Sequence, residues 1–232
     1  MSTGADQHPH STQTPASDRV RLRRIPERGH HDRQTIDGII DSAMVGTVAF
    51  SYEGQPYAIP TNVWREGDRL YWHASRGSRM VRATDGAPVC VSVFLVDELV
   101  LGRSAMHHAV NYRSVVVLGT GNLVTDAAEV EGSLREFIES FYPGRWDRLR
   151  PMTEKERKQT AVMYVDLDEA SAKIRDVGAG DEPGDETWPA WGGAIPVRQV
   201  FGEPRPDEHV PAGMPSPEPA ARLASGERAG AG

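Results

Sequence analysis

Three β-prone runs that follow one another with only turn residues between them constrain the fold of this chain most strongly. They are residues 46–52, 57–64 and 69–74, separated by Glu-Gly-Gln-Pro and Arg-Glu-Gly-Asp. Links this short reverse the chain, because parallel neighbours need a crossover of a dozen or so residues. The sequence therefore predicts an antiparallel meander and argues against a doubly wound nucleotide-binding fold.

Further periodic segments extend this meander into a domain. Residues 32–43 and 126–142 have apolar side chains at helical spacing, with Asp32 and Asp126 as N-caps, and Glu129 suggests a capping box after Asp126. Residues 75–86 could begin a short helix. More strands are expected within 88–96, 113–126 and 161–177. Six or seven mainly antiparallel strands with two or three helices predict a mainly β fold that closes, or partly closes, into a barrel.

Two glycines near the end of one expected strand stand out. Gly119 and Gly121 interrupt an otherwise β-branched run. Glycine inside a strand indicates a bulge or a close approach of another backbone.

The composition of the two ends differs from that of the middle. Residues 1–18 are polar and aperiodic, which predicts a disordered tail, and 19–177 form the expected domain. Residues 178–232 contain nine of the 17 prolines, so we expect a Pro/Gly-rich extension. Within it, 186–203 carries Trp188 and Trp191 and is expected to pack, with the remainder disordered.

Charge and cysteine content exclude several classes of function. The net charge of −7 argues against a general nucleic-acid or anionic-membrane binder. No apolar run approaches the ~20 residues of a membrane helix, and no secretory signal precedes the domain. Cys90 is the one cysteine, so no internal disulfide is possible. These observations favour a cytoplasmic protein.

The segment that follows the third run is the best candidate for binding chemistry. Ser75, Arg76, Gly77, Ser78 and Arg79 stand between a strand and an expected helix. Hydroxyls, a glycine and arginines beside free backbone N–H groups suit a phosphate, although such a loop is more often simply solvated.

Other reactive residues give weaker signals. His73 alone is most simply a half-buried histidine that is satisfied by a backbone carbonyl, and His107 and His108 are adjacent, so they do not face one site. No carboxylate or cysteine stands at ligand spacing beside them, and we predict no metal site built from such a cluster. Hydrolase, Walker and zinc-protease motifs are lacking.

Taken together, several segments resemble a known family. They are PYAIPTNVWREGDRLYWHASRGSRM, PVCVSV, NYRSVVVLGTG, ASAKIRD and WGGAIPV, in this order. The chain is similar over about residues 21–206 to the pyridoxamine 5′-phosphate oxidase-like flavin-binding split barrels. Within that family it resembles the flavin-nucleotide-binding branch that includes the nitroimidazole-resistance reductases.

The resemblance implies a six-stranded antiparallel split β-barrel that forms a homodimer, with FMN in a groove between the subunits. By position, Ser78 and Arg79 match the phosphate-binding step of the family, with Ser75 in the same turn. The residues that match the lining of the flavin ring are Ile59, Pro60, Thr61, Asn62, His73 and Ala74. One departure is Met80, where the oxidases place a lysine, so Arg76 or Arg82 would have to supply that charge.

The resemblance leads to three functional hypotheses. The leading one is an FMN-dependent oxidoreductase, which would pass electrons from a nicotinamide or another donor to a nitro compound, a quinone or oxygen, with His73 beside the ring. Related split barrels bind a deazaflavin coenzyme or haem, for which His73 or His107 could be an axial ligand. A third possibility is a non-catalytic flavin-binding module whose Trp-containing tail engages a partner.

Overall fold

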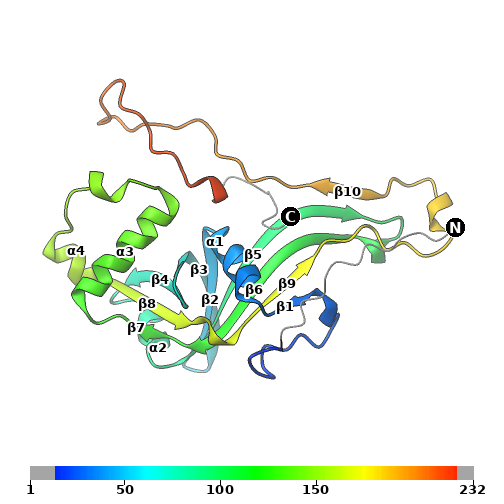
Figure 1. The fold of residues 1–232 in the computed structure, drawn as a ribbon, viewed down its shortest axis with the longest axis horizontal. Helices are drawn as coiled ribbons and strands as arrows, with labels where there is room; N and C mark the ends of the chain where they lie inside the picture. The colour runs from blue at the N-terminus through cyan, green and yellow to red at the C-terminus, as the bar shows by residue number, and fades with distance from the viewer. Residues whose placement is uncertain (1–13, 224–232) are drawn as a thin grey trace.

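The fold is an antiparallel sheet that curls around one core, with helices packed against it (Figure 1). The computed structural model describes residues 14–223. The strands are β1 (Gly29–His30), β2 (Val45–Tyr52), β3 (Gln55–Glu66), β4 (Arg69–Ser75), β5 (Pro88–Leu101), β6 (Ala109–Thr120), β7 (Asn122–Leu123), β8 (Thr160–Asp166), β9 (Ala170–Arg175) and β10 (Gly193–Pro196). The α-helices are α1 (Arg33–Asp41), α2 (Arg79–Thr84), α3 (Ala127–Phe141) and α4 (Glu154–Gln159).

The strand order confirms the predicted mainly β, antiparallel architecture. The sheet follows the path β1-β9-β6-β5-β2-β3-β4-β8-β7, and β10 pairs with β5 outside this path. Seven strands have six residues or more, which agrees with the six or seven expected. The strand expected within 113–126 is present as the end of β6 followed by β7, whereas the sequence did not predict the short strands β1 and β10 or helix α4. Two- to four-residue strands and a polar six-residue helix have little periodicity to detect.

The hairpin between β2 and β3 has the tight turn that the sequence predicted. Glu53 and Gly54 both have positive φ, 52° and 76°. Two such residues make the type I′ turn, whose twist matches that of the flanking strands.

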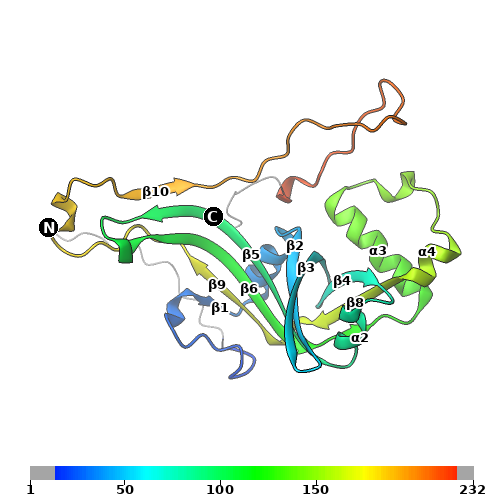
Figure 2. The ribbon, with the colours of Figure 1, turned by 180° about the vertical axis from the view of Figure 1, so that it is seen from behind.

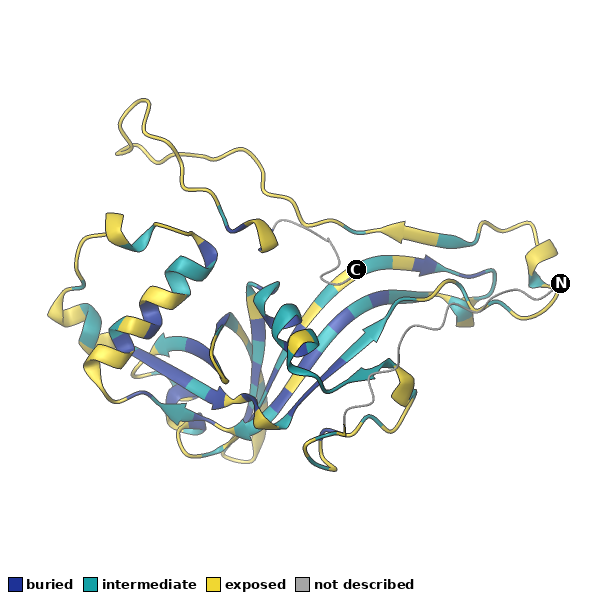
Figure 3. Cartoon of the chain, in the orientation of Figure 1, coloured by how far each residue is buried: buried dark blue, intermediate teal, exposed yellow. Residues whose placement is uncertain are grey.

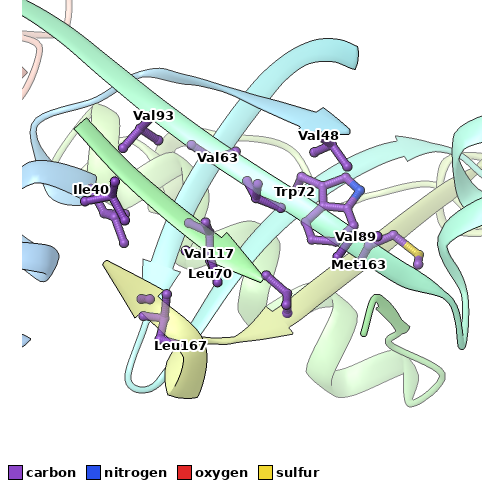
Figure 4. Close-up of a cluster of buried hydrophobic side chains, with 14 of the residues drawn as sticks. Ile40, Val48, Val63, Leu70, Trp72, Val89, Val93, Val117, Met163 and Leu167 are labelled. Atoms are coloured by element: carbon purple, nitrogen blue, oxygen red, sulfur yellow. The ribbon is translucent and has the colours of Figure 1, made fainter. Parts of the chain in front are cut away.

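The main core fills the inside of the curled sheet (Figure 4). Trp72 and Leu70 of β4 point into it and are almost fully enclosed. Helix α1, capped by the Asp32 side chain, closes one side with Ile36, Ile39 and Ile40. The alternation of Leu70 and Trp72 against Tyr71 and His73 is as predicted.

Two glycines allow the sheet to curl and close. A Cβ on Gly119 of β6 would lie 2.5 Å from Cγ2 of Val165 on β8, so these two strands approach closely. A Cβ on Gly121 would clash with the backbone oxygen of Thr84, at the end of α2. Both observations confirm the predicted close backbone approach.

A second apolar layer lies between the outer face of β3, β4 and β8 and helix α3 (Figure 3). Its buried members are Trp64, Tyr71, Val124, Val130, Leu134 and Val162. Asp126 caps α3 as predicted, but the capping box is only half formed. Glu129 forms an ion pair with Arg69 instead of returning to the cap.

Strands β5 and β6 continue beyond the body as a long arm, seen clearly from behind (Figure 2). A register shift between Val96 and Glu98 marks a bulge in the arm, and β10 pairs with its outer half.

The C-terminal extension follows the arm and then returns to the body (Figure 1). Trp188 and Trp191 are exposed in this chain, and Leu223 packs against Phe141 of α3. Disorder was expected for residues 1–18 and for the extension outside 186–203, and of these segments 1–13 and 224–232 lie outside the described residues. Among the described residues, no helix has the length and apolar character needed to span a bilayer.

Replacing Gly121 with alanine tests the close approach at the sheet closure. The added methyl group meets a backbone oxygen that cannot rotate away, so we expect the free energy of unfolding to fall by about 1–3 kcal/mol. Urea denaturation measures this. The control is Gly132→Ala in α3, where nothing lies within 4 Å and alanine should stabilise the helix by up to ~1 kcal/mol. Equal effects of the two substitutions would contradict this account.

Candidate functional site

His73 lies on β4 at the edge of the second apolar layer, on the same side as Tyr71. Its ring is half-buried, with centroids 6.0 Å from Trp64 on β3 and 5.1 Å from Phe137 on α3. The Nδ1 atom is enclosed and has no hydrogen-bond partner among the described residues. A buried polar nitrogen normally has such a partner, so the bond to a backbone carbonyl that the sequence-based interpretation assumed is not formed at this atom.

The surroundings of His73 hold it in its neutral form. Burial lowers the pKa of its imidazole below the ordinary 6.5, because charge is poorly solvated between aromatic rings. The neutral imidazole is the form that binds a metal centre or accepts a hydrogen bond. Near neutral pH the imidazole therefore keeps one unprotonated nitrogen that can bind a metal centre or accept a hydrogen bond.

The turn predicted to bind phosphate begins at the same end of β4 as His73, two residues further along the chain. Ser78 caps α2, and its hydroxyl oxygen accepts a hydrogen bond from the Val81 N–H at 3.2 Å. The guanidinium carbon of Arg79 lies 4.8 Å from the ring centroid of Tyr57 and 5.5 Å from that of Tyr52. These rings hold Arg79 in place without neutralising its charge.

Two more arginines belong to this turn. Arg82 donates a hydrogen bond to the Gly77 carbonyl at 2.5 Å, and the Arg76 N–H donates to the Gln159 carbonyl at 2.8 Å. Neither side chain, nor that of Arg79, forms an ion pair within the described part of the chain. Met80 is buried and packs into the core, so the positive charge at the surface of this turn comes from these three arginines.

The predicted ring-lining residues lie where β3 changes partner. Asn62 pairs with Val45 of β2, whereas the next residue, Val63, pairs with Trp72 of β4. Pairing with β4 therefore stops just before His73 and Ala74, and the two strands diverge there. Ile59, Pro60, Thr61 and Asn62 precede this point; Ile59 packs on the core, and the Asn62 side chain donates to the Met44 carbonyl at 3.2 Å.

The other histidines named as candidates are remote from His73 in this chain. His107 lies at the end of the arm, where its Nε2 is 3.9 Å from a Glu182 carboxylate oxygen. His108 is exposed, with Nδ1 3.0 Å from the Ser104 carbonyl oxygen. The described residues contain no group of three or more His, Cys, Asp or Glu side chains placed to hold a metal ion.

A cavity of about 420 Å³ lies away from all of these residues. It is bounded by β5, by Ser42 after α1 and by residues 197–199 of the extension, and the Arg113–Asp97 ion pair lines it. None of the predicted site residues is fully buried in the single chain. A site between two subunits, as the resemblance implies, would have this property.

Sequence reasoning did not identify Trp64 and Phe137 as neighbours of His73. Phe137 was already expected on the buried face of its helix, and Trp64 at the end of a strand. What could not be predicted is the register that places Trp64 opposite Tyr71 and brings α3 over both.

The comparisons with known proteins agree on one family. Residues 32–174 match the family model described as pyridoxamine 5′-phosphate oxidase. A search of curated proteins finds no match.

Among solved structures, two are similar over most of the chain. The flavocytochrome Anf3 from Azotobacter vinelandii is 36% identical, with a TM-score of 0.84 over 91% of this chain and 97% of that one. An FAD- and haem-binding protein from Mycobacterium smegmatis is 32% identical, with a TM-score of 0.77 over 82% of this chain and 94% of that one. A 5-nitroimidazole resistance protein from Bacteroides thetaiotaomicron shares the fold at 21% identity, with a TM-score of 0.52 over 63% of this chain and 86% of that one.

The rings of Trp64 and Phe137 form an aromatic cage beside His73. Replacing Phe137 with alanine tests whether this cage lowers the pKa of the His73 imidazole. Water then reaches the imidazole, so we expect its pKa to rise toward the ordinary 6.5. Titration of the His73 ring by NMR in the cofactor-free chain measures this, and Tyr142→Ala, at an exposed ring after the same helix, is the control. A pKa that stays low in Phe137→Ala would show that this ring does not set the burial.

Proposed function

The chain belongs to the pyridoxamine 5′-phosphate oxidase-like split-barrel family, and on that premise we propose that it is a flavocytochrome-type oxidoreductase that holds both FAD and haem. Similarity across nine-tenths of the chain to a flavocytochrome, and to a second protein that binds FAD and haem, supports this proposal. The observation that carries it within the chain is the half-buried, neutral ring of His73 beside the aromatic rings of Trp64 and Phe137.

We propose FAD as the flavin, in place of the FMN that the sequence resemblance implied. Three arginines without ion pairs, Arg76, Arg79 and Arg82, surround one turn of a chain whose net charge is −7. The diphosphate of FAD spreads its negative charge over two phosphoryl groups, so separate arginines could each contact a different one. The extra arginines also compensate for the lysine that Met80 replaces.

His73 fits the role of an axial haem ligand. Its imidazole is neutral, and the flat rings of Trp64 and Phe137 beside it suit a large apolar macrocycle. His107, the other histidine considered, is not enclosed by aromatic rings. We therefore assign the haem ligand to His73 and expect His107 to be dispensable.

Bound flavin and haem together would supply hydride and one-electron chemistry. The residues of the chain would bind and orient these groups: Ser78 and Arg79 at the phosphates, and the strand residues Ile59, Pro60, Thr61, Asn62 and Ala74 along the ring. A small organic acceptor or oxygen remains the proposed substrate class, because the described residues show no acid–base pair dedicated to another reaction.

A homodimer would complete this site. One face of the arm exposes Phe94 and Val96 on β5 and Val116 on β6, and Phe94 is 57% exposed. Apolar side chains grouped on one sheet face favour association with a second subunit. The flavin groove would then lie between the arm of one subunit and the basic turn of the other.

Histidine variants test the haem assignment. We expect His73→Ala to lose the Soret absorption of the purified protein, because the substitution removes the imidazole proposed as the iron ligand. His107→Ala, the matched control, should keep it. Loss of the Soret band only in His107→Ala would overturn the assignment.

Removing the Arg79 side chain tests the flavin turn. A charge-assisted hydrogen bond to phosphate contributes about 1.5–3 kcal/mol, so Arg79→Ala should weaken FAD binding about tenfold or more. Fluorescence titration with FAD measures this. Arg148, exposed and without an ion pair, provides the control, and equal affinity of Arg79→Ala and wild type would remove Arg79 from the site.

Introducing a negative charge on the exposed face of the arm tests whether two chains associate through it. We expect Phe94→Glu to convert a dimer to a monomer, since the carboxylate would be buried against apolar side chains. Size-exclusion chromatography with light scattering gives the mass. Met214→Glu, at an exposed site in the extension, should leave it unchanged. A monomeric wild-type protein would contradict this part of the proposal.

A further inference from the structure

A row of three aromatic rings crosses the sheet at right angles to its strands. Trp64 on β3 lies opposite Tyr71 on β4, and Tyr71 lies opposite Tyr164 on β8. The ring centroids of Trp64 and Tyr71 are 5.9 Å apart and nearly parallel, and those of Tyr71 and Tyr164 are 5.6 Å apart. The strand register therefore places three oxidisable side chains in continuous contact.

The inner end of this row touches the histidine of the proposed cofactor site. The Trp64 ring is 6.0 Å from that of His73, and Phe137 covers both. Phenylalanine is much harder to oxidise than tryptophan or tyrosine, so a positive hole that starts beside His73 has one aromatic route, through Trp64.

The inner members of the row cannot easily release a proton. Trp64 is 3% exposed, and its Nε1 has no hydrogen-bond partner among the described residues. Burial raises the pKa of the Tyr71 hydroxyl and outweighs the hydrogen bond with Arg69, which acts in the opposite direction, so this proton is also held. An oxidised ring that keeps its proton remains a strong oxidant and takes an electron from its neighbour.

The outer end differs because it reaches the surface. Tyr164 is half-buried, and the guanidinium carbon of Arg69 lies 4.0 Å from its ring centroid. Because Tyr164 is only half-buried, solvent can take up its phenolic proton when the ring is oxidised. An oxidising equivalent would therefore come to rest at Tyr164.

We propose that Trp64, Tyr71 and Tyr164 form an electron relay between a cofactor bound at His73 and the protein surface. The inference rests on the proposed function, because it needs a redox cofactor at His73. Its biochemical consequence is a path by which an external reductant reaches the cofactor, or by which excess oxidising equivalents leave it.

Hydrogen peroxide provides a defined oxidant for the relay. Reduction of one peroxide to two waters consumes two electrons and two protons. Each electron passes from Trp64 to the cofactor, is replaced from Tyr71 and then from Tyr164, and Tyr164 releases one phenolic proton. Two successive oxidations of Tyr164, with ascorbate restoring the ring between them, supply both electrons and both protons.

The experiment is freeze-quench electron paramagnetic resonance of the haem-loaded full-length protein after one equivalent of peroxide. We expect a tyrosyl radical in the wild type that is lost in Tyr164→Phe and in Trp64→Phe. Both substitutions keep an aromatic ring at its position, so the packing of the layer is largely preserved. Tyr142→Phe, which removes a more exposed tyrosine outside the row, is the control and should keep the signal.

The outcomes separate the relay from the function on which it rests. A protein that binds no haem, judged by its absorption spectrum, overturns the proposed function and the relay with it. A protein that binds haem but gives no tyrosyl radical, or gives the same radical in Tyr164→Phe, overturns the relay alone. A radical lost in Tyr142→Phe would also contradict the relay, because it would place the exit elsewhere.

Discussion

The alternation of side chains along β4 divides this molecule into two apolar layers, and the site depends on that division. Leu70 and Trp72 point into the barrel core, whereas Tyr71 and His73 point toward α3. A shift of the register by one residue would exchange the two sets and bury a histidine in the main core. The anchored pairs Trp72–Val63 and Trp72–Met163 make such a shift costly.

Strand β3 changes its pairing partner beside the candidate site. It leaves β2 at Asn62 and joins β4 at Val63, so the sheet opens beside the predicted ring-lining residues. Gly119 and Gly121 close the far side of the curl by admitting Val165 and the end of α2. The opening lies at the end of β4 that carries His73 and leads directly into the basic turn.

Much of the fold was predictable because its signals are local. The turns at 53–56 and 65–68, the caps Asp32 and Asp126 and the stripe of α3 all depend on neighbouring residues. The cage around His73 was not predictable, since it depends on long-range register and on α3 docking over β4. The same limit applies to the cofactor: Met80 was visible as a departure from the family, but the absence of ion pairs at Arg76 and Arg82 needed the structure.

The central claim is that the chain holds a flavin and a haem at once. The most direct measurement is the absorption spectrum of the purified protein, followed by release and quantification of both cofactors per chain. This account predicts a Soret band together with flavin bands, and FAD as the released flavin. A protein that remains colourless after incubation with FAD and haemin, followed by gel filtration, would contradict it.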